Sequence, residues 1–135
     1  MLGFDCPRFT IPGSEFSGEI EATGKAVTRF KVGDPVFGFS SDRFGAYAEF
    51  MCLPETAVLA TKPINLSYEK AAVLPYGSII ALNLLKKVNI QPGQKVLVNG
   101  ASGAIGSAAV QIAKHYGAEV TGACGTPRLD FVLSL

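Results

Sequence analysis

The residues best suited to chemistry in this 135-residue sequence lie in segment 99–107, Asn-Gly-Ala-Ser-Gly-Ala-Ile-Gly-Ser. Small residues stand wherever a close approach to the backbone would be needed. If a helix begins within this segment, its first turn offers unpaired backbone amides and the positive end of the helix dipole. Both attract a negatively charged diphosphate. We expect the contacts to come from Ser102, Gly103, Ala104, Ile105 and Gly106.

Individual positions in this segment have distinct expected roles. Gly103 would let phosphates come close, Gly106 would let the helix pack tightly on the preceding strand, and Ser102 could add a hydroxyl donor. The match to the pattern G-x-G-x-x-G is imperfect, because Ala101 occupies the first glycine position and Gly100 is shifted by one. The alternative is a small-residue turn that only packs a helix on a sheet, but the flanking strand and helix favour dinucleotide binding.

A second set of residues bears on the choice between nicotinamide cofactors. Dinucleotide folds that prefer NAD(H) usually present Asp or Glu after the second strand. Here segment 123–128 reads Ala-Cys-Gly-Thr-Pro-Arg and contains no carboxylate. Thr126 and Arg128 are suited to binding a 2′-phosphate, which favours NADP(H) over NAD(H). The alternative for Arg128 is a solvated helix residue.

These segments need a strand, a helix and a second strand to position them. Residues 95–99, rich in β-branched side chains, predict a buried parallel strand. Residues 103–116 predict a helix that ends near Gly117, and residues 119–124 predict a second strand. Thr126 is expected to cap a further helix, with proline following it. Strand, helix and strand in this order form a parallel crossover unit.

The first half of the sequence has a different pattern. Up to about Pro63, short apolar runs alternate with glycine and proline, which is typical of strands joined by tight turns. The expected strands are 16–23, 36–38, 46–53 and 58–60. Ser67 is a predicted N-cap of a helix that runs towards Leu74 and is broken or kinked at Pro75. A mostly buried helix is expected through residues 79–88.

Composition excludes several classes of protein. The net charge is +1 with interspersed signs, which leaves no electrostatic footprint for nucleic acid. No apolar run approaches the ~20 residues of a membrane helix, and no secretory signal precedes the first strand. Three widely spaced cysteines predict reduced thiols rather than disulfides or a zinc knuckle. We therefore expect a cytoplasmic protein without a membrane span or a nucleic-acid partner.

The composition also predicts a truncated chain. Hydrophobic residues make up 48% and charged residues 17%, against roughly 25% charged residues in average domains. Two parallel strands do not form a stable sheet alone. We expect the exposed sheet faces that carry Val96, Val98 and Val120 to be buried by further parts of the sheet beyond Leu135. On this hypothesis the 135 residues alone show little catalysis.

Four segments together resemble the medium-chain dehydrogenase/reductase superfamily, in its quinone oxidoreductase-like branch. They are residues 11–18, 30–36, 44–49 and the segment from Asn99. The resemblance implies an α/β fold, with a partial GroES-like β domain followed by the first β-α-β of a Rossmann, or doubly wound parallel, domain. It implies residues 1–66 for the first domain and 67–135 for the second, and it allows a homodimer of the complete protein.

The resemblance also bears on metal binding. Zinc-dependent members carry a histidine after the Pro-Gly pair, where this sequence has Ser14. His115 is the only histidine and is expected at the surface. Cys6 lacks a partner, Glu15 alone cannot hold zinc, and a catalytic zinc needs about three protein ligands. The expectation is a protein without a zinc site.

The reaction implied by the resemblance is hydride transfer from NADPH to a quinone or an α,β-unsaturated carbonyl. Residues 75–78, including Ser78, would lie beside the nicotinamide, while Ile80 replaces a threonine common in relatives. No proton donor is identified. Two alternatives stay open: a non-catalytic nucleotide-binding or structural relative, and a zinc-type alcohol dehydrogenase whose ligands lie outside these residues.

Overall fold

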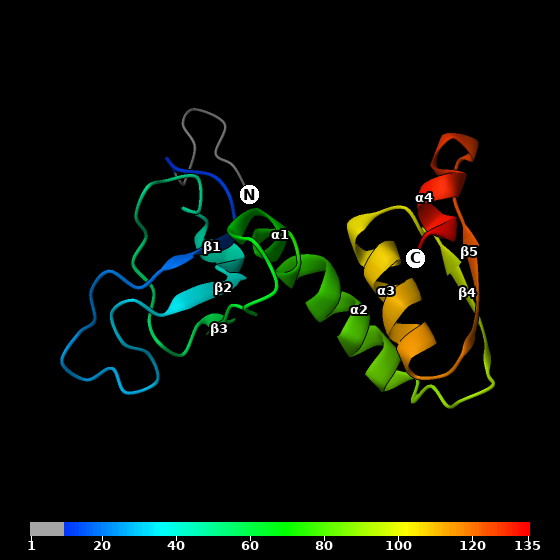
Figure 1. Ribbon diagram of the computed structural model, residues 1–135, viewed down its shortest axis with the longest axis horizontal. Helices are drawn as coiled ribbons and strands as arrows, with labels where there is room; N and C mark the ends of the chain where they lie inside the picture. Colours follow the sequence, from blue (N-terminus) through cyan, green and yellow to red (C-terminus); the bar gives the residue numbers. More distant parts are fainter. Residues whose placement is uncertain (1–9) are drawn as a thin grey trace. The chain divides into compact units, whose positions relative to one another are not determined.

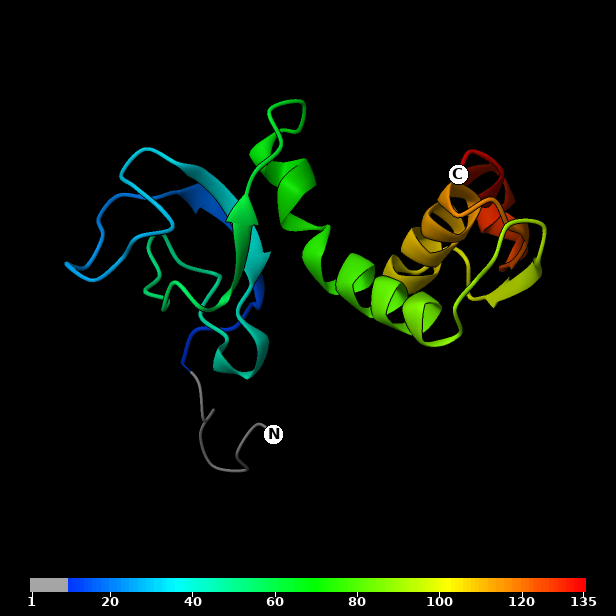
Figure 2. The ribbon, with the colours of Figure 1, turned by 90° about the horizontal axis from the view of Figure 1, so that it is seen from below.

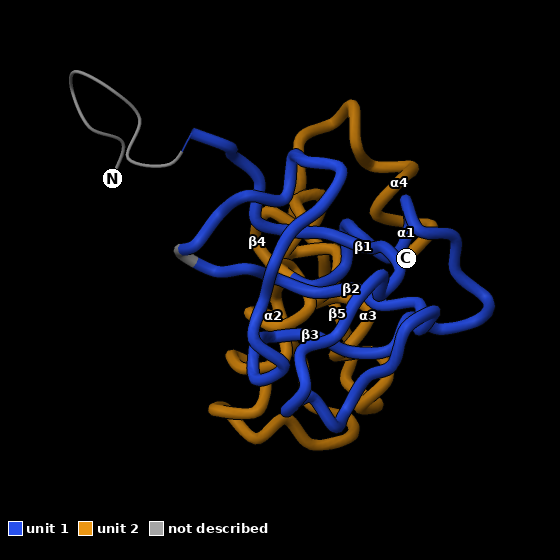
Figure 3. Tube along the Cα trace, turned by 90° about the vertical axis from the view of Figure 1, so that its left-hand side faces the viewer, with its two compact units in different colours: residues 1–75 blue, residues 76–135 orange. Residues whose placement is uncertain are grey.

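The computed structural model describes residues 10–135, and these fall into two compact units, residues 10–75 and residues 76–135 (Figure 3). The first unit carries an antiparallel sheet and the second a parallel pair of strands with helices (Figure 1). This confirms the predicted fold class, α/β with a GroES-like β part followed by the opening β-α-β of a Rossmann-like part. The predicted domain boundary between residues 66 and 67 stays a prediction.

The sheet of the first unit has three strands in the order β1-β2-β3. They are β1 (Glu15–Glu19), β2 (Pro35–Phe39) and β3 (Val58–Thr61). The register pairs Ser17 with Phe37 and Gly38 with Leu59. The strands predicted near residues 16–23, 36–38 and 58–60 are therefore present, because turn residues end each of these runs. The first strand is shorter than expected.

The predicted strand at residues 46–53 was wrong. The structure has a short 3₁₀ helix, η1 (Ser41–Arg43), followed by an irregular segment up to β3. Two hydrogen bonds hold the start of this segment, from the Ala46 N–H to the Gly13 carbonyl and from the Tyr47 N–H to the Pro12 carbonyl. Alternation of apolar residues does not make a strand without a ladder partner, and the segment forms no ladder with the described residues.

Glu55 ties this irregular segment to the loop after β1. Its carboxylate accepts hydrogen bonds from the backbone N–H of Arg29 at 3.0 Å and of Thr28 at 2.9 Å. The Arg29 guanidinium donates in return to the Glu55 carbonyl at 2.6 Å. The two backbone donors hold the pKa of the Glu55 carboxyl below its ordinary value.

The predicted N-cap at Ser67 is present. Its hydroxyl accepts from the Lys70 N–H at 3.3 Å at the start of α1 (Tyr68–Ala72). Ser17 on β1 donates to the Tyr68 carbonyl at 2.5 Å, which ties this helix to the sheet. As expected, the chain breaks near Pro75, where α2 (Pro75–Lys87) begins.

The second unit contains the predicted crossover (Figure 2). After α2 come β4 (Lys95–Asn99), α3 (Ala104–His115) and β5 (Glu119–Ala123). The two strands are parallel, with Val96 opposite Val120 and Asn99 opposite Ala123. Gly117 has a φ of +79°, the left-handed conformation that commonly follows a helix end.

The core of the second unit forms between the strands and the helices that pack on them. Val98, Ala101 and Val110 are buried, and Val96 and Val120 pack against them. Leu97, on the opposite face of β4, is 70% exposed. The expectation that Val96, Val98 and Val120 form the uncovered face was therefore wrong, because successive strand residues point to opposite faces and α3 covers theirs.

The last elements are η2 (Thr126–Arg128), a 3₁₀ helix, and α4 (Leu129–Leu133). Gly125 is the N-cap of η2, and its carbonyl accepts from the Arg128 N–H at 2.9 Å. Thr126 is the first residue of η2 and makes no capping hydrogen bond, so the prediction that Thr126 caps a helix was wrong. In residues 10–135, no helix has both the length and the apolarity needed to cross a bilayer.

Candidate functional site

The turn between β4 and α3 is anchored to the end of the neighbouring strand. The N–H groups of Gly100 and Ala101 both donate to the Ala123 carbonyl at 2.9 Å, and the Gly103 N–H donates to the Gly100 carbonyl at 3.0 Å. Gly100 has a φ of +79°, which favours glycine. The turn is thus held at the carboxyl edge of the parallel pair, where ligands of such sheets bind.

Gly106 locks this turn against the helix. A Cβ built on Gly106 would collide with the Gly100 carbonyl oxygen, and it would lie 2.8 Å from the Gly100 carbonyl carbon and 2.9 Å from the Ala101 Cα. All three neighbours are backbone atoms, which cannot rotate away as a side chain would. The position therefore requires glycine, as expected from its place in the motif.

The first turn of α3 presents backbone N–H groups without acceptors. Gly103 is the N-cap, with no side-chain capping bond, and the first helical bond runs from the Ser107 N–H to the Gly103 carbonyl at 2.8 Å. Among the hydrogen bonds of residues 10–135, none uses the N–H groups of residues 104–106. No acidic residue occurs between Glu69 and Glu119. This turn is therefore a favourable place for an anion.

The approach to these amides is open at Gly103. Gly103 is exposed, and a Cβ built there would meet only the Gly100 carbonyl oxygen, at 3.5 Å. The protein itself would thus tolerate a side chain at Gly103, but that side chain would take up room beside the amides. Ser102, half-buried, brings a hydroxyl to the same turn. The donor set, amide N–H groups and one hydroxyl, matches the oxygens of a diphosphate.

The predicted site residues outside this turn come from two other elements. Thr126 and Arg128 are exposed on η2, directly after β5. Because the ends of β4 and β5 pair through Asn99 and Ala123, η2 begins at the same edge of the sheet as the turn. Ser78 is half-buried on α2.

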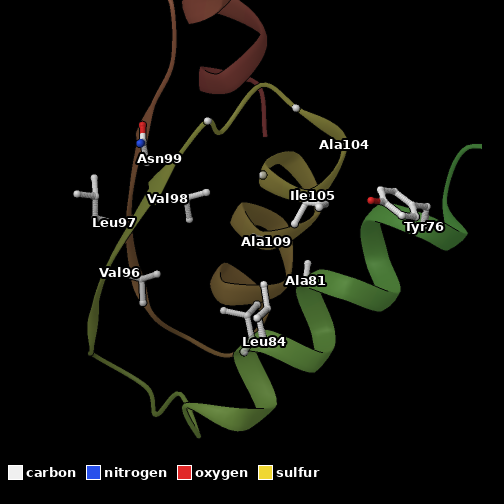
Figure 4. A pocket seen from close by; sticks show the side chains of 14 residues that line it. Tyr76, Ala81, Leu84, Val96, Leu97, Val98, Asn99, Ala104, Ile105 and Ala109 are labelled. Carbon is white, nitrogen blue, oxygen red and sulfur yellow. The ribbon is translucent and has the colours of Figure 1, made fainter. Parts of the chain in front are cut away.

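Gly77, which lies within the residues 75–78 expected beside the nicotinamide, makes a packing contact that sequence reasoning missed. A Cβ built on Gly77 of α2 would lie 2.5 Å from the Ala104 carbonyl oxygen and 2.8 Å from its carbon. The signal that points to such a contact is a glycine within an otherwise apolar helix. Beside this contact, α2, β4 and α3 line an open pocket of about 650 Å³ with a mostly apolar lining (Figure 4). Its lining includes Tyr76, Ala81, Leu85, Val96, Ile105 and Ala109.

Among the described residues, the side chains considered as metal ligands do not form a cluster that could bind a metal ion. Within the described part of the chain, no group of three or more His, Cys, Asp or Glu side chains is placed to hold a metal ion. The Ser14 carbonyl accepts from the Ser40 N–H at 2.7 Å. His115 is exposed, with its ring 5.8 Å from that of Tyr116. Cys6 lies outside the described residues, and Cys52 and Cys124 are free thiols.

Comparison with known families and structures gives a consistent assignment. Residues 2–63 match the alcohol dehydrogenase GroES-like domain. The structure superposes on a quinone oxidoreductase from Coxiella burnetii with a TM-score of 0.83 and 30% sequence identity, covering 91% of this chain and 39% of that one. The match extends through both units of the chain.

Curated relatives agree with the structural match. The chain is 42% identical to a quinone oxidoreductase-like protein 2 homolog of Nematostella vectensis, over 90% of this chain and 33% of that protein. It is 35% identical to a chloroplastic NADPH-dependent alkenal/one oxidoreductase of Arabidopsis thaliana, over 97% of this chain and 36% of that protein. The chain thus spans about a third of the length of these relatives.

Proposed function

We propose that the chain belongs to the medium-chain dehydrogenase/reductase superfamily, in its quinone oxidoreductase-like branch, and that it takes part in NADPH-dependent reduction of a quinone or an α,β-unsaturated carbonyl. The relatives are named as quinone and alkenal/one oxidoreductases, one of them as NADPH-dependent. The proposal assigns residues 99–107 to the diphosphate of the cofactor and requires no zinc.

The observation that carries the proposal is the first turn of α3. Its amides at residues 104–106 have no acceptor among the described residues, and Gly103 leaves the approach to them open. Hydrogen bonds from backbone N–H groups to a charged oxygen contribute about 1.5–3 kcal/mol each. A few such bonds, together with the helix dipole, favour a diphosphate over a neutral ligand.

Each remaining site residue has a proposed role in holding the cofactor. When bound, NADPH supplies the hydride. Arg128 and Thr126 are proposed to bind the 2′-phosphate, because both are exposed at the start of η2 and no carboxylate competes in residues 123–128. Ser78 is proposed to lie beside the nicotinamide. These contacts orient the cofactor, and orientation is the part of the catalysis that the protein contributes.

Binding is tested by titrating the chain with NADPH and following the fluorescence of the nicotinamide. We expect Gly103→Val to abolish the fluorescence change, because its side chain fills the space beside the amides. Gly24→Val is the matched control, since a Cβ built on Gly24 has no neighbour within 4 Å. Equal NADPH affinity of the Gly103 variant and the wild type would refute the assignment of the turn.

Turnover requires a separate test, because the relatives are about three times longer than this chain. A chimera in which residues 10–135 replace the matching part of the Coxiella burnetii enzyme would be assayed for NADPH oxidation with a quinone. We expect oxidation that persists after dialysis against a zinc chelator. NADPH binding without oxidation would favour a non-catalytic relative, and loss of oxidation in the chelator would favour a zinc enzyme.

A further inference from the structure

The turn that begins α3 packs against α2 as well as following β4. The contact is made by Gly77, in the first turn of α2. Gly77 is buried, and a Cβ built on it would lie 2.5 Å from the Ala104 carbonyl oxygen. Real Cβ atoms do not come so close to backbone, so α2 can rest on the Ala104 peptide only through a glycine. Figure 4 shows this end of α2, near Tyr76, beside the start of α3.

This contact acts on one of the amides of the turn. The carbonyl of Ala104 and the N–H of Ile105 belong to the same peptide group, which is planar and rigid. Any tilt of the carbonyl therefore tilts the N–H by the same angle. Ile105 N–H is among the amides without an acceptor in the described residues, so the position of Gly77 determines where that amide points.

A second residue restrains the same carbonyl. The Ser107 hydroxyl donates a hydrogen bond to the Ala104 oxygen at 3.2 Å. We propose that Gly77 and Ser107 are positioning residues: both contact the Ala104 carbonyl oxygen, and by restraining this peptide they aim the Ile105 N–H at the cofactor diphosphate. This inference rests on the proposed function, and it adds the element that aligns the binding turn.

The test uses Gly77→Ala in the full chain. The amide resonance of Ile105 is recorded by NMR, first without ligand and then during titrations with inorganic pyrophosphate and with NADPH. The added methyl would stand about 1 Å inside the contact distance of ~3.5 Å, so the peptide must tilt. We expect the Ile105 resonance to move in the free chain and the Kd for both ligands to rise about tenfold, as for one weakened charged hydrogen bond.

Two controls separate this effect from a general loss of stability. Gly24→Ala makes the same substitution where no atom lies within 4 Å. Ala113→Gly weakens the last turn of α3 at a buried position far along the helix from Ala104. Both controls should keep the Ile105 resonance and the Kd values of the wild type. If Ala113→Gly weakened pyrophosphate binding as much as Gly77→Ala, the positioning role would be refuted.

A milder variant covers the case in which Gly77→Ala does not fold. Ser107→Ala removes one restraint without adding atoms, and we expect a smaller shift of the Ile105 resonance with a rise in Kd of about twofold to threefold. The inference is overturned if Gly77→Ala folds and its Ile105 resonance is unchanged. If Gly77→Ala does not fold, an unchanged Ile105 resonance in Ser107→Ala overturns it. If wild type bound neither ligand, the proposed function would fail, while the resonances of the free chain would still report whether Gly77 orients the peptide.

Discussion

Gly106→Ala is the substitution whose consequence follows most directly from the structure. The new methyl carbon would stand 2.8 Å from the Gly100 carbonyl carbon and 2.9 Å from the Ala101 Cα, and would collide with the Gly100 oxygen. In an open helix the same change would stabilise by about 1 kcal/mol, because alanine favours helix. Here the turn or the helix must shift, and overpacking of this kind costs about 1–3 kcal/mol or more. We expect a net loss in which the steric cost exceeds the helix gain.

Amide hydrogen exchange measures this loss inside the second unit. The amides of Val110 and Ala113, both buried on α3, report the opening of the helix. A net loss of ~1.4 kcal/mol accelerates their exchange about tenfold. Gly24→Ala is the control for the substitution itself, because a Cβ built on Gly24 has no neighbour within 4 Å, and it should leave exchange unchanged. Exchange in Gly106→Ala that is as slow as in wild type would refute the close packing of the turn on α3.

Three further substitutions have defined outcomes. Arg128→Ala should weaken NADPH binding about tenfold and leave NADH binding unchanged, measured by fluorescence titration, because only the 2′-phosphate contact is lost. Glu55 has a lowered pKa in the folded chain, so its bonds to two backbone amides stabilise the loop above the ordinary glutamate pKa and are lost as the pH falls through the folded value. Glu55→Gln should remove this pH dependence from the NMR shifts of those amides. Gly13→Ala should destabilise the first unit in thermal melts, because Gly13 has a φ of +85° and its Cβ would overlap the ring of Tyr47.

Much of the second unit follows from local sequence. The strand at residues 95–99, the helix after Gly103 and the strand from Glu119 were predicted close to their observed bounds, because each run has one period and is ended by glycine or proline. Ser67 was predicted as an N-cap for a similarly local reason. The roles of Ser102, Gly103, Ala104, Ile105 and Gly106 in cofactor binding stay predictions, as do those of Ser78, Thr126 and Arg128.

Two of the errors have a common cause, because both predictions depended on partners that are distant in the sequence. Residues 46–53 alternate like a strand, yet no ladder partner reaches them among the described residues. The wrong face of β4 was expected to be uncovered, because periodicity separates the two faces but does not say which one meets a helix.

The sequence by itself determined the approximate bounds of β4, α3 and β5, and it placed a glycine-rich turn before a helix, because these features depend on neighbouring residues. Only the tertiary structure decided that Val96 and Val98 face α3, that Ala123 anchors the turn, and that Gly77 meets the Ala104 carbonyl. Such contacts join residues far apart along the chain, and their free energy exists only once the elements have packed.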